Sequence, residues 1–376
     1  MNSTKKIKVL VVLSNLRVSN GVASYIMNYF RKLDHDVIQM DFALYQDIKT
    51  PYYAEIKKYG DRIYILPSVK SLWKHIAYCD RILKDNNYDI VHDNTLLLSY
   101  FMMRCAKRRS VPVRILHSHN SCLGETKYKE LRNKAFLPFL LETANLYFSC
   151  SDLAAQTLFG KRPYIFVPNV IPRKKFYFKE IIRRKIRDEL QCHNKFVIGT
   201  VGRLAAQKNP FRAIDIIIEV HKHYPDIQYW WIGSGPLMQE VKFYIEKKQA
   251  TSYIQLFGSR NDVVDLYQAM DLFFLPSLFE GLPVTGIEAQ AMGLPCLVSD
   301  TITKEFVYTD LVSFFSIKQP LARTASIILS YLKKECNRKA YSYMLDQSRF
   351  SDKNAGEFLS ETYRQIYQKY IGESDG

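Results

Sequence analysis

The sequence lacks the features that define several large classes of protein. No apolar run approaches the roughly 18 residues of a membrane-spanning helix. The basic start, MNSTKKIK, leads into a short apolar run with no A-x-A cleavage site behind it, so residues 7–13 are predicted as a buried strand rather than a signal peptide. The seven cysteines form no C-x-x-C pair and show no zinc-type spacing. This pattern favours a reducing compartment over a disulfide framework.

The first predicted strand is not followed by the glycine fingerprint of dinucleotide-binding proteins. It leads into LSNLRVSNGVASY, which contains no G-x-G-x-x-G, and this absence disfavours a nicotinamide enzyme. Gly21 alone opens the first predicted helix, after Asn20. The turn is interpreted either as a loop that faces a phosphate or sugar, or as an ordinary tight turn.

What the sequence has in excess is positive charge. It carries 53 Lys and Arg against 37 Asp and Glu, a net charge of +16, together with 26 Tyr and 22 Phe. Such a chain is expected to meet an anionic partner, which is nucleic acid, an anionic membrane surface or a phosphorylated substrate. No segment resembles a nucleic-acid-binding module. Basic stretches at 127–134 and 173–187 are expected to favour reversible binding to a membrane surface. The first stretch, which Phe136 and Phe139 follow, is interpreted either as an interfacial membrane element or as an ordinary amphipathic helix with its apolar face in the core.

Short β-branched runs alternate with helical patterns throughout the chain, which predicts an α/β fold of two doubly wound, Rossmann-like domains. The two prolines of VPNVIP (167–172) mark the boundary between them. The predicted domains are 1–172 and 173–350, followed by a C-terminal helix within 351–376. Strands are predicted at 7–13, 37–43, 62–66, 89–92, 112–117, 146–149 and 164–167, and then at 196–201, 227–232, 253–257, 271–275, 295–299 and 311–315.

One stretch of the second domain, LFEGLPVTGIEAQAMGLPCLVSD (278–300), predicts an anion site. Pro283 suits the first position of a helix, whose free amides would bind a phosphate. Glu288, about one turn further, would reach a ribose, whereas Glu280 on the preceding loop would face the group at the other end of a diphosphate. The residues predicted to bind here are Glu280, Gly281, Leu282, Pro283, Thr285 and Glu288.

A second loop of this domain, GTVGRLAAQKNP, carries two cations after a predicted strand. Gly202 would let a ligand approach, and Arg203 and Lys208 are predicted to clamp a diphosphate. Such cations stabilise the negative charge of a leaving nucleotide without a metal ion. The following strand ends in IGSGP, whose Gly233 is predicted to line the same site.

In the first domain the strand at 112–117 ends in RILHSHNS. His117 and His119 are interpreted as residues that contact a donor sugar or phosphate, as metal ligands without an evident third partner, or as hydrogen-bonding loop residues. Asp34 and Asp36 spell D-x-D, but they precede a strand rather than follow one. They are therefore predicted to form a solvated turn and not a metal site.

The two loops of the second domain that are predicted to bind a diphosphate resemble the signature of retaining GT-B glycosyltransferases, glycosyltransferase family 4. The resemblance is carried by VGRLxxQKNP and FEGLPxxxxEAxAxGxP. The resemblance implies that two domains face a cleft and that the last helix crosses back to the first. It also implies transfer without a divalent cation or other cofactor. His117, and His119 close behind it, would then lie near the transferred sugar, and the backbone of Ser259 and Arg260 near the nucleobase.

The expected activity is therefore transfer of a sugar, with retention, from a nucleotide-sugar to a saccharide. A UDP-sugar is the expected donor and a lipid-linked acceptor of capsular or exopolysaccharide assembly the expected acceptor. We expect a cytoplasmic enzyme that visits the inner face of the membrane. Two alternatives stay open: a non-hydrolysing nucleotide-sugar epimerase of the same fold, and a non-enzymatic nucleic-acid-binding protein. The residues expected to act in catalysis are His117, His119, Arg203, Lys208 and Glu280.

Overall fold

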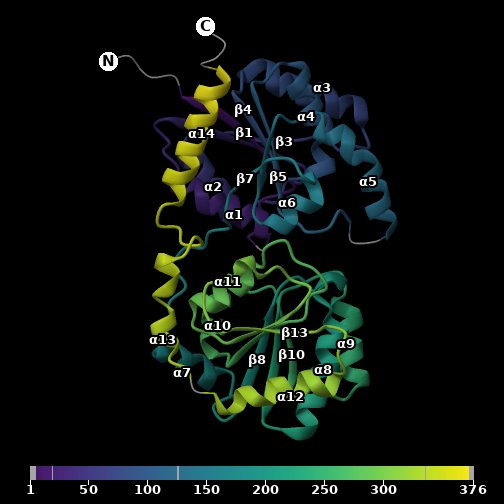
Figure 1. Cartoon of the computed structure of the whole chain (residues 1–376), viewed down its shortest axis with the longest axis vertical. Helices are drawn as coiled ribbons and strands as arrows, with labels where there is room; N and C mark the ends of the chain where they lie inside the picture. The colour runs from purple at the N-terminus through teal and green to yellow at the C-terminus, as the bar shows by residue number, and fades with distance from the viewer. Residues whose placement is uncertain (1–5, 19, 125–126, 335, 372–376) are drawn as a thin grey trace. The chain divides into compact units, whose positions relative to one another are not determined.

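The structure of the chain is a computed structural model, and it describes residues 6–18, 20–124, 127–334 and 336–371. The chain forms two compact units (Figure 1). The N-terminal unit comprises residues 1–170 together with 352–376, and the second unit comprises residues 171–351.

The N-terminal unit is built on a seven-stranded parallel sheet with the order β3-β2-β1-β4-β5-β6-β7. Strand β1 lies between β2 and β4, and its Val9 pairs with Met40 of β2 and with Ile90 of β4. A strand covered on both faces is apolar along its whole length, and β1 is buried almost throughout. The strands are β1 (Ile7–Leu13), β2 (Ile38–Leu44), β3 (Ile63–Ile65), β4 (Ile90–Asp93), β5 (Val113–Ser118), β6 (Leu146–Ser149) and β7 (Ile165–Phe166).

Helices cover both faces of this sheet. Val9 and Val11 belong to a core shared with α1, α2 and α14, whereas Leu10 and Val12 belong to a core shared with α3, α4 and α6. This division follows from the alternation of side chains along a strand. The helices are α1 (Gly21–Phe30), α2 (Pro51–Lys58), α3 (Leu72–Asn86), α4 (Tyr100–Arg108), α5 (Lys127–Leu141), α6 (Asp152–Phe159) and α14 (Ala355–Ile371).

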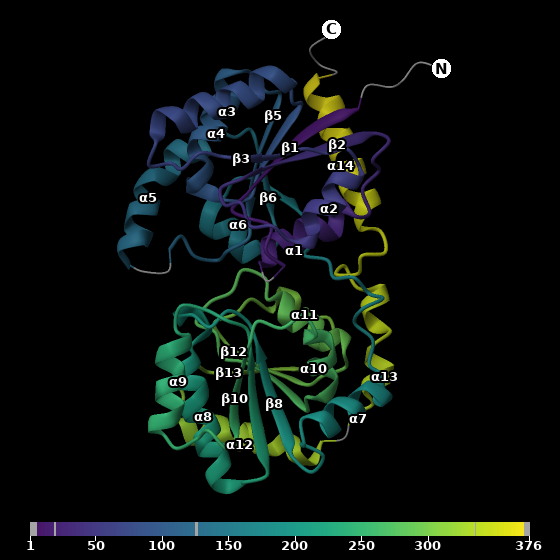
Figure 2. The same ribbon diagram turned by 180° about the vertical axis from the view of Figure 1, so that it is seen from behind.

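The last helix, α14, is an integral part of the N-terminal unit. Leu359, Tyr363 and Ile366 are buried in the core that contains α1 and β1. At its start, a Cβ on Gly356 would lie 1.6 Å from the backbone oxygen of Lys32, so only glycine permits this approach. In both views α14 runs along the side of the unit that carries α1 and α2 (Figures 1 and 2).

The second unit has a six-stranded parallel sheet with the order β10-β9-β8-β11-β12-β13. The strand order reverses between β8 and β11, which is where ligands bind in doubly wound sheets. Its strands are β8 (Phe196–Val201), β9 (Ile227–Ile232), β10 (Ile254–Gly258), β11 (Leu272–Leu275), β12 (Cys296–Ser299) and β13 (Val312–Phe315). Its helices are α7 (Glu180–Glu189), α8 (Pro210–His223), α9 (Met238–Lys247), α10 (Val263–Ala269), α11 (Val284–Ala291), α12 (Leu321–Ser330) and α13 (Arg338–Tyr341).

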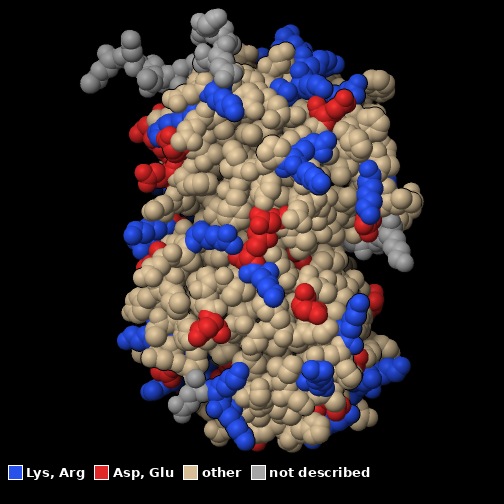
Figure 3. All heavy atoms as spheres, viewed as in Figure 1, with Lys and Arg blue, Asp and Glu red and all other residues tan. Residues whose placement is uncertain are grey.

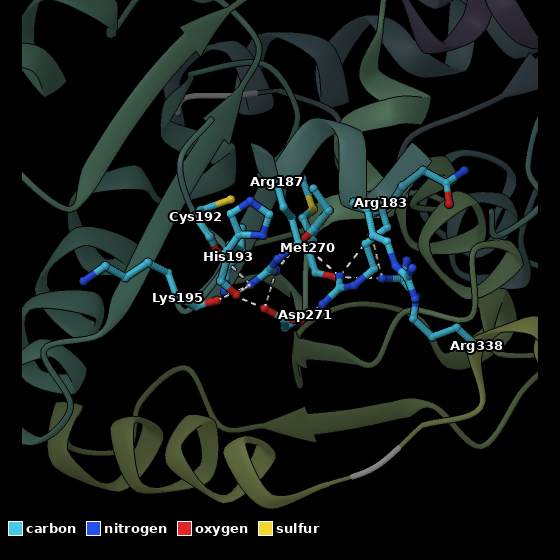
Figure 4. A network of polar contacts seen from close by, with 12 residues as sticks. Arg183, Arg187, Cys192, His193, Lys195, Met270, Asp271 and Arg338 are labelled. Atoms are coloured by element: carbon cyan, nitrogen blue, oxygen red, sulfur yellow. Dashed lines mark hydrogen bonds and ion pairs between the residues drawn. The ribbon is translucent and has the colours of Figure 1, made fainter. Parts of the chain in front are cut away.

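An arginine network attaches α7 to the sheet of the second unit (Figure 4). Arg183 and Arg187 both point toward Asp271 and donate to its carboxylate, at 2.5 and 3.0 Å. Arg187 also donates to the backbone oxygens of Ala269 and Cys192, each at 2.8 Å, and only 9% of its side chain is exposed. Two cations of the predicted membrane-binding stretch 173–187 are therefore held by the protein itself.

The predicted fold class and strand positions are confirmed. The strands at 7–13, 146–149, 196–201 and 227–232 coincide with the predicted ranges, and the others differ by one residue at one or both ends. Between β4 and α4 the chain forms a 3-10 turn, Leu96–Ser99, that leads directly into α4. Leu96 has a φ of 57°, which an α-helix does not permit.

Candidate functional site

The loops that follow β8 and β11 flank the point where the strand order of the second unit reverses. They meet through a pair of opposite charges. Lys208 Nζ donates to Glu280 Oε1 at 2.5 Å, with 13% and 10% of the two side chains exposed. Burial of this kind strengthens the attraction and makes either partner costly to remove. The sequence assigned the two residues separate roles, whereas the structure brings them into direct contact.

Gln207 joins the same two loops. Its Nε2 donates to the backbone oxygen of Phe279 at 2.9 Å and to Glu280 Oε2 at 3.3 Å. The backbone N–H of Leu278 donates a hydrogen bond to the backbone oxygen of Gln207 at 2.8 Å. The Glu280 carboxylate therefore accepts bonds at both oxygens, and its position is fixed in the absence of any ligand.

Two predicted glycines are required by close packing at this place. A Cβ on Gly202 would lie 2.9 Å from Lys208 Cε, so the glycine leaves space for the lysine stem. A Cβ on Gly233 would lie 2.1 Å from the backbone oxygen of Gly202, and the φ of Gly233 is +135°. These glycines therefore shape the loops, independently of any contact with a ligand.

The remaining predicted positions of this unit lie near the ends of β8 and β10. Arg203 is exposed on the β8 loop. Arg260 is also exposed, and its guanidinium pairs with Asp262 at 2.6 Å. The backbone N–H of Ser259 donates to the Ser234 hydroxyl at 2.9 Å. A nucleobase held here would therefore have to use groups other than that N–H.

The helix α11 begins one residue later than predicted, at Val284, with Pro283 as its N-cap residue. No side chain among the described residues caps it, in contrast to α1, where Asn20 accepts from two backbone amides. The Thr285 hydroxyl, in the first turn, is buried and has no hydrogen-bond partner in the described chain. An uncapped helix start that follows Glu280, the partner of Lys208, suits an anion. The preceding Gly281 and Leu282 are buried.

Glu288 lies one turn into α11, where Tyr267 donates a hydrogen bond to its Oε2 at 3.0 Å. Burial raises the pKa of Glu288 to about 7, and the Tyr267 bond opposes this shift. The carboxyl therefore changes charge near neutral pH. A ligand that donates hydrogen bonds to it would favour the charged form.

In the N-terminal unit, His117 and His119 lie at the carboxyl end of β5 and are part of a buried group of rings. His117 Nδ1 is 3.0 Å from His92 Nε2, and His92 Nδ1 is 2.7 Å from the Tyr363 hydroxyl. His119 Nε2 is 2.8 Å from Asn94 Oδ1. Burial lowers the pKa of His92 and of His119 to about 3, and that of His117 well below its ordinary value. All three imidazoles are therefore neutral.

Three polar atoms of this group have no hydrogen-bond partner among the described residues: Tyr25 Oη, His117 Nε2 and His119 Nδ1. The Tyr25 ring lies 5.3 Å from the His117 ring and 5.1 Å from the His119 ring, both in edge contact. Buried polar atoms without a partner are rare and usually mark a missing water or ligand. A hydroxylated molecule bound beside the HSHNS segment could form hydrogen bonds with these three atoms.

Two other predicted positions are placed as follows. Gly21 opens α1 with open space around it. Asp34 pairs with Arg364 of α14 at 2.5 Å, and its other carboxylate oxygen accepts from the backbone N–H of Asp36 at 3.2 Å. Nowhere in the described ranges do three His, Cys, Asp or Glu side chains come together as ligands for a metal ion.

Known structures resemble this chain over almost its whole length. HepE from Anabaena in complex with UDP-glucose has a TM-score of 0.78 at 16% identity, covering 95% of this chain and 99% of that protein. WaaG, a glycosyltransferase involved in lipopolysaccharide biosynthesis, has a TM-score of 0.72 at 14% identity, covering 97% of this chain and all of that one. At these identities the likeness establishes the fold, which is that of the GT-B glycosyltransferases.

Sequence relatives define the family. The family model described as "Glycosyl transferases group 1" matches residues 182–343 of this chain. The putative glycosyltransferase EpsF of Bacillus subtilis is 30% identical over 346 residues, 87% of this chain and 88% of that protein. The UDP-Gal:alpha-D-GlcNAc-diphosphoundecaprenol alpha-1,3-galactosyltransferase of Escherichia coli is 29% identical over 69% of this chain and 72% of its own length. The chain belongs to the group 1 family of glycosyltransferases, as its sequence motifs predict.

Sequence reasoning missed four residues of these sites. Gln207 and Tyr267, which hold Glu280 and Glu288, occur in segments whose patterns indicate only a loop and a buried helix. His92 ends a predicted strand, and its signal was a histidine in an otherwise apolar run, IVHD. Tyr363 carries no local signal, because it is one of several tyrosines on an ordinary amphipathic helix.

Proposed function

We propose that this glycosyltransferase moves a sugar from a UDP-sugar to a lipid-linked saccharide, with retention of configuration and without a divalent metal ion. The observation that carries the proposal is the Lys208–Glu280 contact at the point where the strand order reverses, beside the uncapped start of α11. Arg203 lies on the same loop as Lys208. The two cations and the helix amides form a site for a diphosphate.

Each part of the donor has a residue to meet it. Arg203 and Lys208 neutralise the diphosphate as the sugar bond breaks, and α11 contributes the partial positive charge of its N-terminus. Glu288 accepts hydrogen bonds from the ribose. Glu280 holds Lys208 and faces the transferred sugar. No protein base is required in this scheme, because the departing phosphate takes the proton of the acceptor on the same face.

The assignment of uridine is supported by two printed descriptions. HepE was solved in complex with UDP-glucose, and the name of the Escherichia coli relative specifies UDP-Gal as its donor. The family also favours transfer over the epimerase alternative. The nucleic-acid alternative gains no support from the face in Figure 3, where Lys and Arg are scattered with acidic residues among them.

A lipid-linked acceptor is supported by α5 of the N-terminal unit. Its residues Tyr128, Leu131 and Phe139 share one helical face and are each more than half exposed, as is Phe136 beside them. Leu140 and Leu141 are buried, so this helix has apolar side chains on two faces. A soluble surface helix has one such face, and the second is available to a lipid. The side chain of Lys127 lies outside the described residues.

A pocket of about 230 Å³ lies beside this face and is lined mainly by leucine, with Arg132 and Asn133 from α5. Its apolar lining is Leu96, Leu97, Leu98, Leu123, Leu137 and Leu158. An apolar space of this size holds a segment of hydrocarbon chain, since cavities of ~150 Å³ already bind benzene. Arg132 and the exposed Lys129 and Lys134 would meet an anionic head group.

We further propose that the enzyme acts at the inner face of the cell membrane in the assembly of a capsular or exopolysaccharide. The name of the Escherichia coli relative includes a diphosphoundecaprenol-linked acceptor. Of the helices in the described part of the chain, none is both long and apolar enough to cross a membrane. Contact through α5 and its basic neighbours would therefore have to be peripheral.

The test is calorimetric titration with UDP-glucose, UDP-galactose, UDP-N-acetylglucosamine and GDP-mannose. We expect a uridine donor to bind, and Arg203→Ala to weaken that binding by tenfold or more, the size of a lost bond to a charged group (about 1.5–3 kcal/mol). The matched control is Arg323→Ala, an exposed arginine on α12. Binding of the guanosine donor alone, or equal loss in both variants, would contradict the assignment.

A further inference from the structure

The group of buried rings at the end of β5 contains a continuous chain of hydrogen bonds that starts on the C-terminal helix. Tyr363 of α14 bonds to His92 at 2.7 Å, and His92 bonds to His117 at 3.0 Å. The far nitrogen of His117, Nε2, has no partner in the described chain. Each imidazole is neutral and carries one proton, so the chain can run in only two directions.

In the first direction the Tyr363 hydroxyl donates to His92 Nδ1. His92 then donates from Nε2 to His117 Nδ1, and the proton of His117 resides on Nε2. In the second direction His117 donates from Nδ1 to His92, which donates from Nδ1 to the oxygen of Tyr363. The hydroxyl proton of Tyr363 then needs another acceptor, and His117 Nε2 is left as a bare lone pair.

The first direction is favoured for two reasons. Tyr363 is fully buried, and the described residues give its hydroxyl no other partner, so the second direction leaves two buried groups unsatisfied instead of one. A phenol is also a stronger acid than a neutral imidazole, and an imidazole nitrogen is a stronger base than a phenol oxygen. Donation from Tyr363 to His92 therefore pairs the better donor with the better acceptor.

His119 provides an internal comparison, because its proton is fixed in a different way. The Asn94 amide donates to the backbone oxygen of His92 at 3.2 Å, which identifies Asn94 Oδ1 as an acceptor. His119 therefore donates from Nε2 to that oxygen, and its Nδ1 is a bare acceptor. The unpartnered atoms of the group thus include a donor from His117 and an acceptor from His119, the pair that a sugar hydroxyl requires.

We propose that Tyr363 and His92 are positioning residues that hold the proton of His117 on Nε2, so that His117 donates a hydrogen bond to a hydroxyl oxygen of a bound sugar. The role assigned to the sugar rests on the proposed function, whereas the direction of the proton chain does not. The proposal gives the C-terminal helix a part in the site beyond its part in the core. His117 acts as a neutral donor and not as a base.

The experiment compares the full-length protein with Tyr363→Phe, which removes only the hydroxyl. The matched control is Tyr370→Phe, also on α14, whose hydroxyl donates to the backbone oxygen of Asn145 at 3.2 Å. Nitrogen-15 NMR of labelled histidines reports which ring nitrogen carries the proton. Release of UDP from a UDP-sugar, with and without a saccharide acceptor, reports turnover.

We expect His92 and His117 of the native protein to be protonated on Nε2. In Tyr363→Phe, His92 loses its donor, and the two directions then leave the same number of buried groups unsatisfied, so a fraction of His117 moves its proton to Nδ1. Turnover should fall in proportion to that fraction, about twofold where the two directions are equally populated, while the Kd for UDP stays the same. Tyr370→Phe should change neither the protonated nitrogens of the histidines nor the turnover.

An unchanged proton pattern in Tyr363→Phe would overturn the proposal, and so would equal losses of turnover in the two variants. A changed pattern with full turnover would overturn the role of His117 toward the sugar. If the native protein releases no UDP from any uridine donor, the proposed function fails instead. The NMR comparison would still decide the direction of the proton chain.

Discussion

At the scale of single residues, the site of the second unit depends on the charge of two carboxylates in different surroundings. Glu280 is paired with Lys208 at 2.5 Å. Glu288 has no cation beside it in the hydrogen bonds and ion pairs of the described residues, and burial raises its pKa to about 7. Mutation therefore tests the ion pair of Glu280, and pH tests the carboxyl of Glu288.

The contact between Lys208 and Glu280 predicts that their mutations are not additive. Lys208→Met and Glu280→Gln should each lower turnover severely, because each leaves the partner buried without its opposite charge. The loss of transition-state stabilisation in the double variant should be smaller than the sum of the two single losses by ~1–3 kcal/mol. Turnover in the four proteins gives the coupling directly. The exposed pair Lys195–Asp226 is the control cycle and should show almost none.

The raised pKa of Glu288 predicts that UDP binding depends on pH. Ribose hydroxyls favour the carboxylate, so binding below pH 7 must release the proton that burial retains. The affinity should therefore fall as the pH falls below 7, toward a limit of about tenfold per pH unit. Calorimetry at pH 6, 7 and 8 measures this. Glu288→Gln should retain only the dependence due to UDP itself, and an unchanged profile in that variant would refute the assignment.

At the scale of secondary-structure elements, helices α7 and α5 have similarly basic sequences, but their cationic side chains lie in different surroundings. The cations of α7 turn inward to an aspartate and to backbone oxygens. The basic residues of α5 whose side chains are described are Lys129, Arg132 and Lys134, and all three are exposed beside aromatic rings. The first helix is therefore expected to matter for stability and the second for surface binding.

For α7 we predict that Arg187→Ala lowers the free energy of unfolding of the second unit by about 2–4 kcal/mol, since it removes bonds from a buried guanidinium to the half-buried Asp271 carboxylate and to several backbone oxygens. Arg184→Ala, on the same helix but 77% exposed at its side chain, should change it by less than ~0.5 kcal/mol. Urea denaturation followed by tryptophan fluorescence suits this unit, which contains the buried Trp230 and Trp231. Equal effects would contradict the inward role of Arg187.

For α5 we predict that replacing Phe136 and Phe139 together by serine weakens binding to vesicles of anionic lipid by about tenfold or more, because each ring removed from water contributes up to about 2 kcal/mol. The fold should be unaffected, since both rings are more than half exposed. Phe243→Ser on α9, where the ring is 67% exposed, is the control. Sedimentation at low and high salt measures binding. No loss in the α5 variant would argue for a soluble acceptor.

At the scale of the whole molecule, two units of the same topology divide the chemistry between them. The second unit carries the groups proposed to bind the diphosphate and the ribose, and the N-terminal unit carries the buried rings and the apolar face of α5. Neither set contains a described cluster of metal ligands, and Asp34 of the D-x-D triplet is held by Arg364. The proposed function assigns the charge of the leaving nucleotide to the side chains of Arg203 and Lys208.

This assignment predicts that transfer proceeds at its full rate in excess EDTA. Side chains that are already in place neutralise the diphosphate, so removal of divalent ions should leave both the KM for the donor and the turnover unchanged. The rate of UDP release, with and without added magnesium or manganese, is the measurement. A rate that disappears in EDTA and returns with either ion would overturn metal independence and reopen Asp34 and Asp36 as ligands.

The sequence alone determined the order of strands and helices, the fold class and the family, and it predicts the loops proposed to carry the site. It did so because buried parallel strands are continuous apolar runs, and because the glycines, prolines and charges that follow them are local in the chain. The motifs FEGLP and GRLAAQKNP can therefore be recognised from the sequence alone.

Only the tertiary structure decided which of these residues meet. Lys208 and Glu280 are separated by 72 positions, and Tyr363 lies 271 positions from His92. The inward turn of Arg183 and Arg187 likewise depends on Asp271, which lies 88 and 84 positions away. Periodicity fixes the face on which a side chain lies, but the partner it meets is set by the order of strands in the sheet and by the return of the last helix, and neither is encoded locally.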